Sequence, residues 1–208
     1  MIKRLAIAAT ILAASAAPAF AHLDPAEHGS FVAGISHPLS GPDHIFAMVA
    51  VGLWAALLAQ GSGRSDKRAA GSRATWLVPA AFVGMMALGF AAALHDLPLS
   101  FVEPVILASV VVIGLLAAAA LAVPTALAMA MVGFFAFFHG HAHGGELGSA
   151  GALAFGVGFA LATTLLHLAG IGFGFGLGRL FGSGGGRLAA RLVGGATALG
   201  GLCLAIAT

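Results

Sequence analysis

The sequence has very little charge for its length. Of its 208 residues, 8% are charged and 60% are hydrophobic, and the mean hydropathy is +1.05. Soluble domains carry roughly 25% charged residues, so this composition excludes a water-soluble fold. The nine Lys and Arg residues are also too few to make nucleic acid a plausible partner. Their placement matters more than the net charge of +2.

Cysteine is almost absent, which limits the possible metal chemistry. Cys203 alone can form neither an intramolecular disulfide nor a thiolate metal cluster. Any metal site must therefore use nitrogen and oxygen ligands. The late glycines do not predict a phosphate-binding loop, because they follow no strand and precede no Gly-Lys-Ser/Thr sequence. We expect no prosthetic group, only a bound or transported metal ion.

The first 21 residues have the pattern of a cleavable signal peptide. Lys3 and Arg4 precede an apolar run, residues 5–14, and Ala19-Phe20-Ala21 fits a cleavage site. The apolar run is too short to span about 30 Å of hydrocarbon comfortably, which disfavours an uncleaved first helix. The mature chain, 22–208, is then a single transmembrane domain in a bacterial inner membrane, with a periplasmic N-terminus.

Six apolar stretches of the mature chain are each long enough for a spanning helix, which needs about 20 residues. We therefore predict an all-α, polytopic membrane helix bundle. Pro124 separates two adjacent stretches and predicts a tight helical hairpin. The expected helices are approximately 31–60, 75–94, 99–122, 124–141, 150–178 and 187–208.

Basic residues fall in two connections that this arrangement places on one side of the membrane. Positively charged loops face the cytoplasm, so both connections are expected there. The histidines and carboxylates then lie mostly on the opposite, outer side. The basic residues are Arg64, Lys67, Arg68 and Arg73 in one connection, and Arg179, Arg187 and Arg191 in the other.

The first motif interrupts an apolar run and reads His37-Pro38-Leu39-Ser40-Gly41-Pro42-Asp43-His44. Two prolines and a glycine predict a broken helix, which is tolerated at membrane depth where the backbone lines a cavity. The break would bring His37 toward Asp43 and His44. Isolated histidines are usually solvated, but ionisable groups within a span cost roughly 2.5 to 3.5 kcal/mol each, and a bound divalent cation would offset that cost.

The second motif, Phe138-His139-Gly140-His141-Ala142-His143-Gly144-Gly145-Glu146, closes the fourth apolar stretch. If it is helical, His139, His143 and Glu146 share one face and His141 points away. If it is extended, the three histidines share a face instead. Both alternatives bring at least two imidazoles together, so we take His139, His143 and Glu146 as metal ligands with His37, Asp43 and His44.

Several further residues are possible secondary ligands, each with a structural alternative. His95 and Asp96 could equally be solvated loop residues, and His167 could be an interhelical hydrogen-bonding group. The remaining candidates are Glu103, His141, and His22 and His28 in the N-terminal tail.

Glycines recur at four-residue spacing late in the chain. Gly170, Gly174 and Gly178 form one row and Gly172 and Gly176 another, which predicts close helix packing. Residues 182–186 are expected to form a cytoplasmic turn.

The two histidine motifs, behind a signal peptide and among six spans, resemble those of the HupE/UreJ family of hydrogenase and urease accessory proteins. The resemblance covers essentially the whole chain. It implies a nickel permease with a functional link to hydrogenase or urease. The family's His-x5-Asp-His motif falls on His37, Asp43 and His44, and its His-x-x-Glu motif on His143 and Glu146.

We therefore expect a non-enzymatic secondary permease for uptake of a divalent cation, with Ni²⁺ favoured by the resemblance alone. Imidazole and carboxylate ligands also suit Co²⁺, Zn²⁺ and Cu²⁺. Two alternatives stay open. One is a metal-binding accessory or sensor protein for metalloenzyme maturation, and the other is an intramembrane metalloenzyme.

Overall fold

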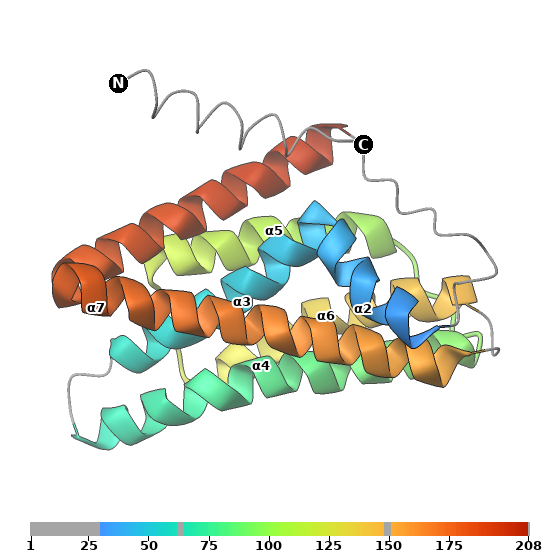
Figure 1. The fold of residues 1–208 in the computed structure, drawn as a ribbon, viewed down its shortest axis with the longest axis horizontal. Helices are drawn as coiled ribbons and strands as arrows, with labels where there is room; N and C mark the ends of the chain where they lie inside the picture. Colours follow the sequence, from blue (N-terminus) through green and yellow to red (C-terminus); the bar gives the residue numbers. More distant parts are fainter. Residues whose placement is uncertain (1–29, 62–64, 148–150, 208) are drawn as a thin grey trace.

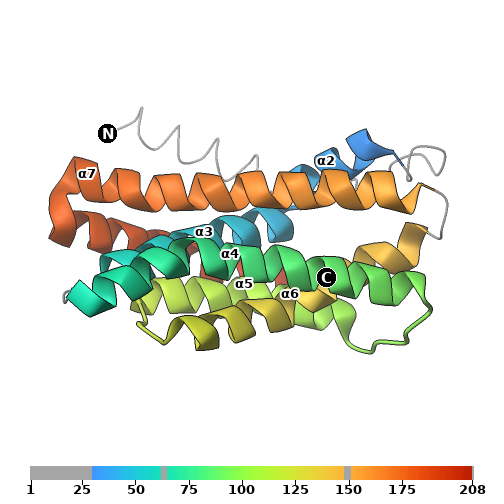
Figure 2. The same cartoon turned by 90° about the horizontal axis from the view of Figure 1, so that it is seen from below.

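The computed structural model describes residues 30–61, 65–147 and 151–207, and every element in these ranges is a helix. The helices pack into one elongated bundle (Figures 1 and 2). The expected signal peptide, 1–21, lies outside the described residues, and so do His22 and His28 of the mature N-terminal tail. The helices are α2 (Phe31–Ser40), α3 (Pro42–Gln60), α4 (Ser65–Leu94), α5 (Val102–Ala119), α6 (Thr125–Leu147) and α7 (Ala152–Ala207).

Five of these helices, α3 to α7, are long and apolar enough to cross a membrane. Large apolar side chains such as Leu88, Leu153 and Ile206 are exposed on the outside of the bundle, where a bilayer would cover them. The chain is a multi-pass membrane protein, and the predicted all-α bundle is confirmed.

α7 is continuous along the chain but is divided by a sharp kink into two straight helical arms. A straight helix of 56 residues would be roughly 84 Å long, far more than a bilayer. The backbone leaves helical geometry at Gly182, with φ 71°, and the chain reverses there (Figure 1). The two arms, 152–181 and 183–207, lie antiparallel, so the bundle contains six long apolar rods.

α3 is the central helix. Of its apolar window, 67% is buried, against 39% for each of the other long helices. Every residue from Ala50 to Leu58 is buried, and the Trp54 Nε1–H donates to Leu121 O at 3.0 Å. The rest of the bundle is therefore built around α3.

α3 and the first arm of α7 touch through their backbones. A Cβ added at Gly52 would come within 2.1 Å of His167 O, and one at Gly170 within 2.2 Å of Val49 O. Only glycine permits this approach. The row of Gly170, Gly174 and Gly178 packs closely, as predicted, and its neighbour is α3. The same prediction for Gly172 and Gly176 is wrong, because a Cβ at either would meet nothing within 4 Å.

The helix bounds differ from the expected ones in three places. α4 begins at Ser65 rather than near 75, and α6 continues through the histidine motif to Leu147 rather than stopping at 141. The expected turn over 182–186 is confined to Gly182. At the end of α6, unpaired backbone groups in an apolar environment would be costly, so this helix continues through residues that would end it in water.

The hairpin predicted at Pro124 is present. α5 ends at Ala119 and α6 begins at Thr125, with Pro124 O accepting from the Ala128 N–H at 3.0 Å.

Candidate metal centre

The break between α2 and α3 brings the residues of the first motif together. α2 holds His37 in its last turn, Gly41 is extended, and Pro42 restarts the chain as α3, with Asp43 in the first turn. With 10 residues, α2 is roughly 15 Å long and reaches only part of the way across a membrane. Its end therefore places the His37 ring 5.4 Å from the His44 ring, between centroids.

α6 supplies the histidines of the second motif, and the helical alternative is the one observed. His139 and His143 are both buried, one turn apart on the same face. His141 points elsewhere and donates from Nε2 to Leu97 O at 2.7 Å, outside the site. Glu146 lies in the last turn of α6, and its side chain is outside the described residues.

Three imidazoles from three helices form the three-histidine cluster, which consists of His37, His44 and His143. One ring nitrogen from each lies within 4.8 Å of the others, and Nε2 of His44 is 2.8 Å from Nε2 of His143. Two ring nitrogens at this distance share one hydrogen. A cation bound to both lone pairs would take its place.

Asp43 contacts the far side of the His44 ring. Its Oδ2 is 2.8 Å from His44 Nδ1, at ion-pair distance but without the angle of a hydrogen bond. The negative charge favours a hydrogen on Nδ1, which leaves the Nε2 lone pair facing His143. Carboxylates beside metal-ligating histidines orient the ring in this way, so the geometry gives Asp43 an orienting position.

Aromatic rings close the cluster on the α7 side. The Phe159 ring lies 4.8 Å from that of His143 and 6.1 Å from that of His44, between centroids. Phe155 stands 6.0 Å from His37. Such an apolar wall excludes water and strengthens electrostatic interactions within the site.

His139 lies beside the cluster rather than in it. Its ring is 5.2 Å from that of His44, and its Nε2 is 2.9 Å from Ser109 Oγ. Sequence reasoning did not select Ser109. The available signal was a hydroxyl within the otherwise apolar stretch that became α5.

The other candidates lie apart from the cluster. Glu103 is exposed in the first turn of α5, and His95 and Asp96 are exposed in the turn after α4. His167 is buried in α7, with Nδ1 2.7 Å from Met48 O, so the interhelical hydrogen bond weighed as an alternative is present.

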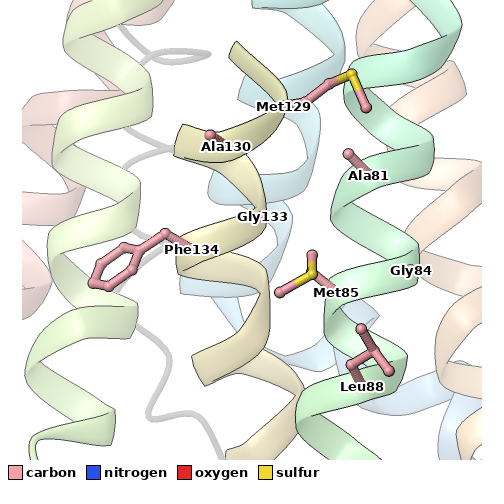
Figure 3. A pocket seen from close by; sticks show the side chains of 8 residues that line it. All are labelled: Ala81, Gly84, Met85, Leu88, Met129, Ala130, Gly133 and Phe134. Atoms are coloured by element: carbon pink, nitrogen blue, oxygen red, sulfur yellow. The ribbon is translucent and has the colours of Figure 1, made fainter. Parts of the chain in front are cut away.

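A hollow of about 610 Å³ between α4 and α6 is lined by no side-chain nitrogen or oxygen atom (Figure 3). It lies on the outside of the bundle and its lining is apolar, consisting of Ala81, Gly84, Met85, Leu88, Met129, Ala130, Gly133 and Phe134. Among the described residues, the ligand chemistry is concentrated instead at the three-histidine cluster.

The family described as HupE / UreJ protein matches residues 10–204, which include both histidine motifs. The chain belongs to the HupE/UreJ family. Protein HupE of Rhizobium leguminosarum bv. viciae is 42% identical over 116 residues. That match covers 55% of this chain and 54% of the relative, so the chain spans about half the length of the curated HupE protein it matches. No solved structure matches the chain.

Proposed function

We propose that this HupE/UreJ protein is a secondary permease that moves a divalent transition-metal cation, Ni²⁺ first of all, across the membrane. The observation that carries the proposal is the three-histidine cluster, in which nitrogens from α2, α3 and α6 converge within 4.8 Å. The cluster belongs to a bundle of membrane-spanning helices. Histidines are expensive at membrane depth and mark ion pathways there.

The ligand set defines the class of cation. Neutral imidazoles with a nearby carboxylate suit Ni²⁺, Co²⁺, Zn²⁺ and Cu²⁺, whereas Mg²⁺ and Ca²⁺ prefer oxygen ligands. For such sites, intrinsic affinity would favour Cu²⁺ over Ni²⁺. The choice of Ni²⁺ rests on the resemblance to the HupE/UreJ family, and with it a link to a nickel enzyme such as hydrogenase or urease.

The two ends of the bundle support uptake as the direction. The histidine end is formed by the α2–α3 break, the end of α6 and the start of α7. The basic end is formed by the start of α4 and the turn of α7 (Figure 1). Arg187 and Arg191 follow the turn at Gly182 in the sequence. Basic residues favour the cytoplasmic side, so the cluster would face outward in a bacterial inner membrane.

Uptake of ⁶³Ni²⁺ into proteoliposomes tests the proposal. Purified wild-type protein is expected to accumulate the label above protein-free vesicles. His44→Ala removes a cluster imidazole and should lower the initial rate of uptake by at least about tenfold. Even residues that only hydrogen-bond a metal ligand change metal affinity or activity about 10- to 100-fold when they are mutated. Competition by Co²⁺, Zn²⁺ and Cu²⁺ in the same assay ranks the cations.

His141→Ala is the matched control, because it removes an imidazole from α6 whose Nε2 bonds Leu97 O away from the cluster. Its uptake should stay close to that of the wild type. If wild-type vesicles bind Ni²⁺ without accumulating it, the protein is an accessory or sensor protein and not a permease. Equal uptake by the wild type and His44→Ala would show that the three-histidine cluster takes no part in transport.

A further inference from the structure

Two buried histidines lie deeper in the bundle than the three-histidine cluster. His139 is one turn before His143 on α6 and is 0% exposed, and His167 on α7 is 1% exposed. His167 stands two turns beyond Phe159, which borders the cluster. The proposed function gives neither of them a role.

Ser109 determines which nitrogen of His139 carries the hydrogen. The Ser109 hydroxyl donates its single hydrogen to Ile106 O at 2.6 Å. Its oxygen must therefore accept from His139 Nε2, which lies 2.9 Å away. The hydrogen of the neutral ring is then on Nε2, and Nδ1 carries a lone pair.

The backbone carbonyl of Met48 determines in the same way which nitrogen of His167 carries the hydrogen. A backbone carbonyl only accepts hydrogen bonds, so the 2.7 Å contact with Met48 O requires a hydrogen on Nδ1 of His167. The lone pair is then on Nε2. The glycine contacts at Gly52 and Gly170 hold this part of α7 directly against α3, which keeps the carbonyl and the ring in register.

Both lone-pair nitrogens are buried without a hydrogen-bond partner among the described residues: Nδ1 of His139 and Nε2 of His167. An unsatisfied buried acceptor costs free energy. An imidazole that donates one N–H to a carbonyl or hydroxyl and presents the other nitrogen bare has the arrangement of a metal-ligating histidine.

The ring of Phe82 on α4 lies against the rings of both His139 and His167. Its centroid is 5.7 Å from that of His139 and 5.0 Å from that of His167. His139 in turn lies 5.2 Å from His44 of the cluster. The rings thus form a continuous series from the cluster toward the middle of the bundle.

We propose that His139 and His167 form an inner binding step for the divalent transition-metal cation, reached after the three-histidine cluster, with Nε2 of His167 as its deepest ligand. This inference rests on the proposed function, because it extends the same pathway inward. The competing explanation makes His167 only a clamp between α3 and α7 through Met48 O.

One substitution separates the two explanations. In His167→Asn, the side-chain amide can still donate to Met48 O from about the position of Nδ1, but Nε2 is lost. We expect the maximal rate of ⁶³Ni²⁺ uptake to fall by at least about tenfold, with the KM nearly unchanged because capture occurs at the cluster. Thr163→Val, which alters a buried neighbour of equal size on α7, should behave like the wild type.

A binding measurement gives a readout that a clamp would not affect. The His37→Ala/His44→Ala variant lacks most of the cluster, and in equilibrium dialysis with ⁶³Ni²⁺ it should still hold a weakly bound ion. Adding His167→Asn should abolish that ion. If His167→Asn is not recovered from membranes, His139→Gln is measured in its place, because its side-chain amide can still donate to Ser109 Oγ from about the position of Nε2, while the bare Nδ1 is lost.

Uptake by His167→Asn equal to that of Thr163→Val would overturn the inner step. So would residual binding that the added His167→Asn leaves intact. Failure of the proposed function is a different result, because wild-type vesicles would then accumulate no ⁶³Ni²⁺. The dialysis comparison would still decide whether His167 binds the cation.

Discussion

Asp43 contacts the outer side of the His44 ring and does not point to the place where the three imidazole nitrogens converge. Its Oδ2 lies 2.8 Å from His44 Nδ1, while the nitrogens that converge are those of the three imidazoles. The carboxylate would thereby act on a bound cation through the basicity and orientation of His44. This effect of one carboxylate on one imidazole can be tested by replacing a single oxygen atom of the Asp43 side chain.

Asp43→Asn keeps the shape of the side chain and removes its charge. We expect the affinity of the purified protein for Ni²⁺ to fall about 10- to 100-fold, which is the usual effect of losing such a partner. Isothermal titration in detergent measures it. Asp66→Asn makes the same change in the first turn of α4, at the basic end, and should leave the affinity unaltered; an equal loss in both variants would count against a local role for Asp43.

The residues of the cluster could be predicted because each lies in a dense polar motif within an apolar sequence. His37, His44 and His143 were all selected on that basis. Ser109 was not, because a single hydroxyl in an apolar helix is common, and its importance comes from the approach of His139 on another helix. Side-chain direction was the missing information, as the position of Asp43 also shows.

At the scale of elements, the contact between α3 and α7 depends on which glycine row faces the neighbour. Gly170→Ala would place a Cβ 2.2 Å from Val49 O, whereas Gly172→Ala would meet nothing within 4 Å. We expect Gly170→Ala to destabilise the protein by about 1 to 3 kcal/mol, as overpacking usually does.

Thermal unfolding in detergent compares the two alanine variants directly. Gly172→Ala should unfold at nearly the wild-type temperature, because the added methyl group meets no neighbouring atom of the protein. Identical unfolding temperatures for the two variants would mean that α3 and α7 separate easily, contrary to the close backbone contact.

Sequence patterns predicted the helices better than their ends. The apolar stretches indicated where helices lie, and Pro124 and Gly41 correctly marked two interruptions. The end of α6 was wrong because its glycines and histidines are poor helix formers in water. In the bundle, Gly144, which lies beyond the predicted end, packs against Phe90 O of α4, and this tertiary contact, which no local pattern reveals, outweighs propensity.

At the scale of the whole molecule, the separation of histidines from basic residues fixes an expected orientation. A reporter fused after Gly63 should be active in the cytoplasm, and one fused after Gly144 should be active on the outside. Alkaline phosphatase and green fluorescent protein fusions at both sites measure this. The reverse pattern would turn the cluster toward the cytoplasm and make export the direction of transport.

The buried stretch of α3 from Ala50 to Leu58 has an electrical consequence. It is roughly 12 Å long and apolar throughout, so this part of the bundle acts as a thin insulator between the histidine end and the basic end. Most of the membrane voltage should therefore drop across it. A divalent cation crossing 100 mV gains about 4.6 kcal/mol, and that gain would drive the passage beyond His167 rather than the initial capture at the cluster.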